Sequence, residues 1–266
     1  MAEEIAGVCS AGAGSVVSLL AVCLVLHLLP RLGAPGKRTS DWLCVAPGID
    51  LVLFIFTVVP PAAGWIVRGW PGFLGAVLGQ YAALLVWTAA HELTNLGTRG
   101  GPRLYRVHHR MFGFVRNLSA LLATTLAVPL FIHVRLAQLL VYPLLSLLVE
   151  LPRYNAREWV SVSRHKFSGL VGHDLVWCLY CDWMTGVWSL ASEMLRNVES
   201  FWCPIRFLDA AKCDNCKQDF PDVASGWVDA AGNVGDAVRV LEARYERANP
   251  GSNAWYGHPV RLKVLR

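Results

Sequence analysis

The chain has few charged residues for its length, and this shortage narrows its fold class. Only 16% of its 266 residues are Asp, Glu, Lys or Arg, whereas 55% are hydrophobic and the mean hydropathy is +0.41. An ordinary soluble domain carries about 25% charged residues and could not bury this much apolar surface. The sequence therefore predicts an integral membrane protein.

Charge is missing altogether from the first long segment. The run from Ile5 to Leu29 holds 25 residues without Asp, Glu, Lys or Arg, and a helix needs roughly 20 residues to cross a bilayer. A cleaved signal peptide is the alternative, but Glu3 and Glu4 stand where such a peptide carries basic residues. We therefore expect a first membrane span here.

Four further uncharged runs form two pairs, each separated by one arginine. The pairs are Leu51–Val67 with Gly69–Ala90, and Asn117–Val134 with Leu136–Val149. The first pair predicts a tight hairpin around Arg68. The second is either one long helix with a buried Arg135 or a hairpin with Arg135 at its tip, since an unpaired arginine in mid-membrane is costly. Its last run is short for a span and also suits a re-entrant helix.

Basic residues in the short loops predict the orientation, because cytoplasmic loops collect Lys and Arg. One side of the predicted spans would hold Arg31, Lys37, Arg38, Arg99, Arg103, Arg106, Arg110, Arg116, Arg153, Arg157, Arg164 and Lys166. The other side would hold only Arg68 and Arg135. This asymmetry favours the hairpin at Arg135, with the N-terminus outside and the C-terminal tail in the cytoplasm.

The expected fold class is thus α: a multi-pass transmembrane helical bundle of three spans plus a membrane hairpin, with a small cysteine-bearing cytoplasmic tail. Residues 1–150 would form the transmembrane domain, 151–207 a membrane-proximal cytoplasmic segment, and 208–266 the soluble tail. Within the tail, Asp236 to Arg247 predicts an amphipathic helix closed by Asn249–Gly251. The net charge of +5 sits beside the spans, which favours membrane lipid over nucleic acid as the partner.

Five of the eight cysteines fall after the predicted spans, as two Cys-x-x-Cys pairs with one cysteine between them: Cys178, Cys181, Cys203, Cys213 and Cys216. Disulfides are not the default in the reducing cytoplasm, whereas thiolates at this spacing bind zinc or iron. The polar, turn-prone stretch around Cys213 and Cys216 suits a metal-binding knuckle joined by at least one of the other three. A redox-active dithiol, a disulfide or unligated thiols remain alternatives.

Histidines gather near the predicted cytoplasmic face, at His91, His108, His109, His165 and His173. A non-haem iron site needs several imidazoles and carboxylates at one point, and helix ends on the same membrane face can supply them. Asp174, next to His173, is a candidate carboxylate ligand. The alternative is that these histidines lie at the membrane interface beside lipid headgroups.

The order of these motifs resembles the fatty acid hydroxylase and sterol desaturase superfamily of membrane di-iron enzymes, over roughly residues 70–188. His91–Asn95 stands at the position of the first histidine box and Leu104–His109 at the second. The apolar run 117–149 then matches the membrane hairpin, His165 the third box, and Cys181–Val187 the closing element. Asn95 replaces the second histidine of the first box, and Ser168 interrupts the third box. The sequence therefore offers too few ligands for a two-iron site.

The resemblance implies a membrane-bound lipid-modifying oxidoreductase that uses iron on the histidine cluster and acts on a lipid substrate. The tail cysteines would then hold a structural zinc, or an iron or iron–sulfur centre, and an electron donor would be a partner. The alternative is a non-catalytic membrane subunit that has lost its iron and keeps a metal-stapled tail for docking a protein partner. The missing ligands favour this second interpretation.

Overall fold

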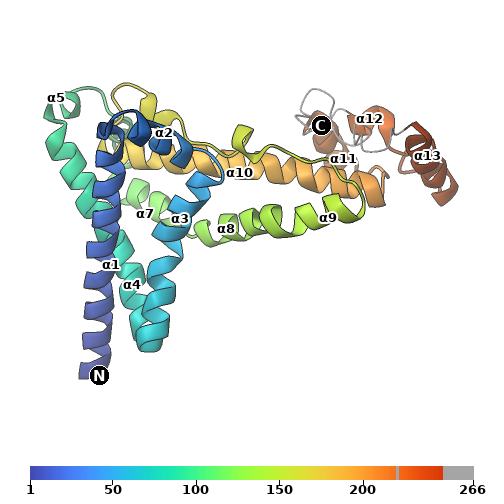
Figure 1. Ribbon diagram of the computed structural model, residues 1–266. Coiled ribbons are helices and arrows are strands. Elements are labelled where there is room, and N and C mark those ends of the chain that lie inside the picture. The colour runs from blue at the N-terminus through green and yellow to red at the C-terminus, as the bar shows by residue number, and fades with distance from the viewer. Residues whose placement is uncertain (220–221, 248–266) are drawn as a thin grey trace. The chain divides into compact units, whose positions relative to one another are not determined.

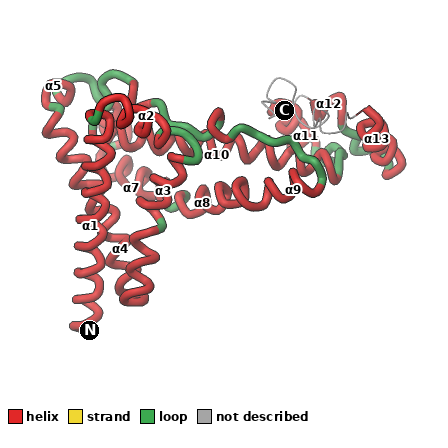
Figure 2. Tube along the Cα trace, viewed as in Figure 1, coloured by secondary structure: helices red, strands yellow, loops and turns green. Residues whose placement is uncertain are grey.

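The computed structural model describes residues 1–219 and 222–247, and almost all of them lie in helices or in short connections (Figures 1 and 2). No strand occurs in these ranges, where the β structure is limited to the isolated bridges Val45–Ser161 and Ile205–Val228. The α-helices are α1 (Ala2–Leu28), α2 (Gly33–Leu43), α3 (Gly48–Thr57), α4 (Val59–Thr94), α5 (Leu96–Arg99), α6 (Leu104–Phe112), α7 (Phe114–Thr125), α8 (Val128–Leu136), α9 (Tyr142–Leu148), α10 (Gly172–Trp202), α11 (Ala210–Asp219), α12 (Asp222–Gly226) and α13 (Val234–Arg247).

Three helical segments are long and apolar enough to cross a membrane: Ala2–Arg31, Gly48–Thr94 and Phe114–Leu148. Most of their side chains point outward from the protein. A soluble fold would turn apolar side chains inward, because burying them is its main driving force. The predicted helical fold class is confirmed for the described residues, and these three segments have the length and apolarity that a membrane span requires.

The chain reverses direction inside α4, as the sequence predicts. Gly69 has φ +59° and ψ −143°, which breaks the helix into two limbs next to Arg68. The limbs come so close that a Cβ built on Gly64 would lie 2.3 Å from the carbonyl oxygen of Gly72. The hairpin around Arg68 is therefore confirmed, and two glycines permit its close backbone contact.

The second limb of α4 packs against α1 through small residues, and the two run parallel. A Cβ built on Gly75 would lie 2.2 Å from the carbonyl oxygen of Val8, and one on Gly79 would lie 2.4 Å from that of Gly12. Helices in membranes associate through such small residues because lipid tails are as apolar as leucine, so close van der Waals packing provides the attraction. This contact fixes where the C-terminal end of α4 lies.

The second predicted hairpin differs from the structure. Val128 to Leu148 is continuously helical through α8, a π-helical turn at Ala137–Val141 and α9, so the expectation of a tip at Arg135 is wrong. Instead Arg135 is buried and donates from Nη1 to Gln138 Oε1 at 2.8 Å. A partner inside the helix removes the penalty that made a hairpin tip attractive.

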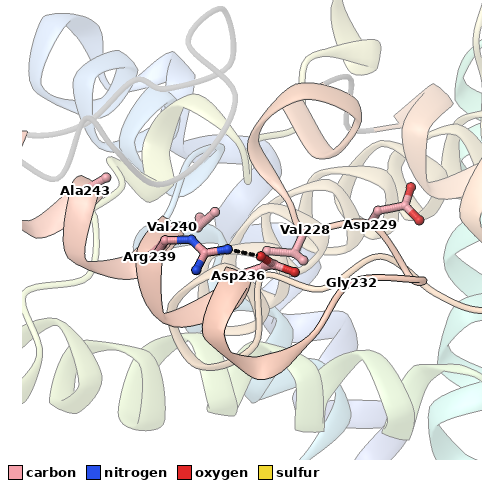
Figure 3. A pocket seen from close by; sticks show the side chains of 7 residues that line it. All are labelled: Val228, Asp229, Gly232, Asp236, Arg239, Val240 and Ala243. Carbon is pink, nitrogen blue, oxygen red and sulfur yellow. Dashed lines mark hydrogen bonds and ion pairs between the residues drawn. The ribbon is translucent and has the colours of Figure 1, made fainter.

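The chain divides into two compact units. The first contains Met1–Thr125 and Val160–Gly186, and the second contains Leu126–Trp159 and the described residues from Val187 onward. In the second unit α13 is present as predicted, and the expected stop at Asn249–Gly251 lies outside the described residues. Asn233 and Asp236 cap α13 reciprocally, and a shallow pocket beside this cap is lined by Val228, Asp236 and Arg239 (Figure 3).

The close α1–α4 contact predicts that one added methyl group is harmful at Gly75 and harmless at Gly14. Gly75→Ala should lower the stability of the protein by about 1–3 kcal/mol, since the new Cβ would meet the Val8 backbone. Gly14→Ala is the matched control because nothing lies within 4 Å of a Cβ there. Thermal unfolding in detergent compares the two variants, and equal midpoints would contradict this packing.

Candidate functional site

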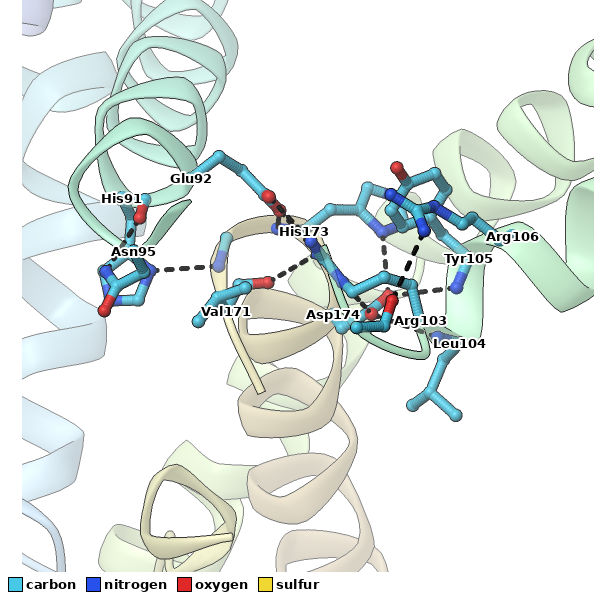
Figure 4. A network of polar contacts seen from close by, with 12 residues as sticks. His91, Glu92, Asn95, Arg103, Leu104, Tyr105, Arg106, Val171, His173 and Asp174 are labelled. Carbon is cyan, nitrogen blue, oxygen red and sulfur yellow. Dashed lines mark hydrogen bonds and ion pairs between the residues drawn. The ribbon is translucent and has the colours of Figure 1, made fainter. Parts of the chain in front are cut away.

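The polar site of the first unit is built around Arg103, just before α6. Its side chain is fully buried and donates to Glu92 through both terminal nitrogens, with Nη1 2.6 Å from Glu92 Oε2 (Figure 4). Nε donates to Asp174 Oδ2 at 2.8 Å, and Nη2 also donates to the carbonyl oxygen of Val171 at 2.9 Å. The guanidinium thereby joins the end of α4, the start of α6 and the start of α10.

Asp174 connects this ion pair to the N-terminus of α6. Its carboxylate accepts from the backbone N–H groups of Leu104 at 3.1 Å and Tyr105 at 3.0 Å. The first N–H groups of a helix lack partners within the helix and carry a partial positive charge, so a carboxylate there is stabilising. Asp174 therefore orients α6 as well as neutralising Arg103.

The backbone at the start of α10 completes the site. Gly172 donates its N–H to His91 Nδ1 at 3.0 Å, so the ring of His91 accepts through that nitrogen. Gly172 has φ +50°, and a Cβ there would lie 2.3 Å from Glu92 Oε1. Both the left-handed conformation and the close carboxylate require glycine at this position.

Aromatic rings cover one side of the network. The Tyr105 ring lies 4.9 Å below the Arg103 guanidinium and packs edge-on against His173 at 5.6 Å and His109 at 5.3 Å. Trp177 donates from Nε1 to His173 Nε2 at 3.1 Å. The Tyr105 ring stabilises the cation by cation–π attraction and limits its contact with water.

The pKa values of the two central groups follow from these contacts. Burial by itself raises the pKa of Asp174, but the contact with His173 and the hydrogen bonds from Arg103 and the Tyr105 N–H outweigh it, so the pKa lies below its usual range. The hydrogen bond to Glu92 is the main reason that the pKa of Arg103 is raised. Both groups are charged at neutral pH.

The structure brings together only some of the predicted metal ligands. His91, His173 and Asp174 share the Arg103 network, and His109 reaches its edge through the Tyr105 ring. His108 is exposed on α6, and His165 lies in a short 3-10 turn, where burial lowers its pKa. Near it, Asp182 of the expected closing element accepts from the backbone N–H groups of Ser163 and Arg164.

The cysteines are all free thiols. Cys178 and Cys181 lie in the first unit, one turn apart on α10, whereas Cys203, Cys213 and Cys216 belong to the second. The stretch around Cys213 and Cys216 is helix α11, so the expected knuckle-shaped turn is wrong. Their prediction as joint metal ligands stays a prediction.

In residues 1–219 and 222–247, no three His, Cys, Asp or Glu side chains are grouped as the ligands of a metal ion would be. Two central residues were missed as site residues by sequence reasoning. Glu92 was visible only as the second residue of the first box, and Arg103 only as one basic loop residue among many. The ion pair between Glu92 and Arg103 identifies both as site residues, and the spacing of residues along the sequence does not reveal that pair.

Comparison with known proteins gives no further assignment, since no family model, no curated protein and no solved structure matches the chain.

Removal of the central cation should strongly destabilise the protein. Arg103→Ala leaves two carboxylates without their partner, and breaking a buried ion pair costs about 3–5 kcal/mol. Arg103→Lys keeps the charge but not the paired geometry, so its loss should be intermediate. Arg110→Ala, at an exposed position on α6, is the control. Chemical unfolding in detergent measures all three, and an Arg103→Ala variant as stable as the control would contradict the network's role.

The lowered pKa of Asp174 predicts a loss of stability in acid. The ionised carboxylate contributes fully above its unfolded pKa of about 4, and this contribution is lost as the pH falls towards the lower pKa of the folded state. Asp174→Asn cannot titrate, so its unfolding midpoint should be lower at neutral pH and change less below pH of about 4. Identical acid sensitivity in both proteins would refute this assignment.

Proposed function

We propose that this chain is a multi-pass membrane protein whose hydroxylase-like helix ends are organised by an arginine, and that it acts as a non-catalytic membrane subunit. The observation that carries the proposal is the position of Arg103. Its guanidinium lies between Glu92 and Asp174, and Asp174 is one of the groups that the resemblance assigns to iron.

Electrostatics favour this interpretation. A metal ion shared by His91, His173 and Asp174 would lie beside a buried guanidinium, and like charges repel strongly where water is scarce. The Asp174 carboxylate is moreover engaged by the arginine and by two backbone N–H groups. The described residues therefore do not fit an iron site in this arrangement.

The proposed topology has the N-terminus outside and residues 99–116 in the cytoplasm. The hairpin at Gly69 supports it, because it returns α4 to the end of the bundle where α1 also ends. The arginines of the loops then lie beside the anionic cytoplasmic leaflet. The tail, with Cys213 and Cys216 on α11, would dock a protein partner.

A membrane-bound, lipid-modifying oxidoreductase is the second candidate. One observation favours it: His91 and His173 meet in the same network, and His109 lies at its edge. Iron would require Arg103 to leave its position between the carboxylates. The two candidates therefore predict different metal contents.

Elemental analysis of the purified full-length protein separates them. We expect no stoichiometric iron, and no change of metal content in His91→Ala or His173→Ala. Stoichiometric iron that is lost in both variants would overturn the proposal in favour of the oxidoreductase. Zinc that is lost only in Cys213→Ser and Cys216→Ser would agree with the proposal and would assign a zinc site to the tail. His27→Ala is the control, and it should not change the metal content.

A further inference from the structure

The helical rod from Val128 to Leu148 in the second unit has its polar side chains on the inside. Its buried positions are Phe131, Arg135, Gln138, Tyr142 and Ser146, and three of these five, Arg135, Gln138 and Ser146, are polar or charged. The π-helical turn keeps Gln138 and Tyr142 on the same side of the rod as Arg135. This rod therefore presents a polar stripe to its neighbour.

The neighbour is the second half of α10, from Val187 to Trp202, which runs beside the rod in the same direction. Gln138 Nε2 donates to the carbonyl oxygen of Val187 at 2.7 Å, and further along Asn197 Nδ2 donates to Tyr142 Oη at 3.4 Å. Asn197 also donates to Tyr154 Oη. The side chains that α10 buries here include Glu193, Arg196, Asn197 and Ser200, each at most 2% exposed.

One buried ion pair lies in this interface. Arg196 Nη2 donates to Glu193 Oε2 at 2.9 Å, one turn away on α10, and both side chains are 1% exposed. Arg135 donates to Gln138 on the rod itself. Inside the interface, burial is the main cause that raises the pKa of Tyr154 to about 12.

The outer face of the same rod is apolar from Leu136 to Leu148. Every exposed residue from Leu136 to Leu148 is Leu, Val, Ala or Pro, with Leu144 58% and Leu147 69% exposed. The exposed large side chains of α10 in this half are Trp188, Leu195 and Trp202, spaced seven residues apart on one side of the helix. Both helices therefore point large apolar side chains away from their shared interface, which holds the buried polar groups together with an apolar cluster around Tyr142.

This distribution is the reverse of a water-soluble helix pair, which buries its apolar stripe and exposes its polar one. In lipid it is favourable, because the acyl chains solvate the leucines while Gln138 and Tyr142 hydrogen-bond across the helix interface. The rod also continues a segment, Phe114–Leu148, that is apolar enough to cross a membrane.

We propose that lipid acyl chains cover the outer face of this helix pair, so that Val187–Trp202 is embedded beside the rod. The sequence alone places residues 151–207 in the cytoplasm, because Pro, Asp, Asn and charged residues return after Glu150. The ion pair between Glu193 and Arg196 lowers the cost of placing these two charges in lipid. Lipid contact, and not a protein partner, is the function of the exposed leucines and tryptophans.

Site-directed spin labelling in liposomes tests this proposal on the full-length chain, with the native cysteines replaced and one cysteine introduced at a time. Nitroxides at Leu144 and Leu195, the latter 62% exposed, are compared with Val17 of α1 as the lipid reference and Asp214 of α11 as the water reference. Collision with oxygen reports lipid exposure, and collision with a water-soluble nickel chelate reports water exposure.

We expect labels at 144 and 195 to behave like the label at 17, with oxygen collisions well above nickel collisions. A ratio like that at 214 would mean that water covers this face and would overturn the proposal. Protection from both reagents would also overturn it, because a protein partner or a second copy of the chain would then cover the surface. The spectra of all four labelled proteins must show the mobility of a label on an ordered helix surface. If the label at position 144 alone disturbs its helix, the collision ratio at position 195 decides the test.

Discussion

The Arg103 guanidinium is the interaction on which the first unit depends. It carries one positive charge, and its two carboxylate partners carry two negative charges, so the cluster retains a net negative charge after the ion pairs are formed. The N-terminal N–H groups of α6 face that remaining charge through Asp174. Each of the three helices therefore makes a different contribution: α4 supplies the Glu92 carboxylate, α10 supplies the Asp174 carboxylate, and α6 supplies its N-terminal N–H groups.

That cluster can form only because smaller constraints place its parts. The glycines of α4 allow the helix to lie against α1 and so fix the end that carries His91 and Glu92. At α10, Gly172 leaves room for the Glu92 carboxylate and turns the chain so that Asp174 faces α6. A side chain at either place would separate the charges, and separated charges in an apolar setting are expensive.

The sequence predicts well what depends on polarity along the chain. The absence of charge gives the long apolar helices, Arg68 and Gly69 mark the hairpin, and the pattern of Asp236–Arg247 gives α13. It fails where a polar residue finds its partner by folding. Arg135 was assigned to a hairpin tip because its bond to Gln138 and the polar stripe of α10 cannot be read from hydropathy. Arg103 was counted only for its charge, although its partners lie 11 and 71 residues away.

Buried ion pairs add little net stability compared with apolar side chains of the same shape, because desolvation offsets most of the attraction. The effect of Arg103 is therefore mainly geometric. Its planar guanidinium donates in fixed directions to Glu92, Asp174 and the Val171 carbonyl, so α4, α6 and α10 meet in only one arrangement. Apolar contacts would allow these helix ends to slide, since hydrophobic attraction is not directional. In a membrane protein, where lipid competes equally for every apolar face, such directional polar contacts decide which helices meet and in which register.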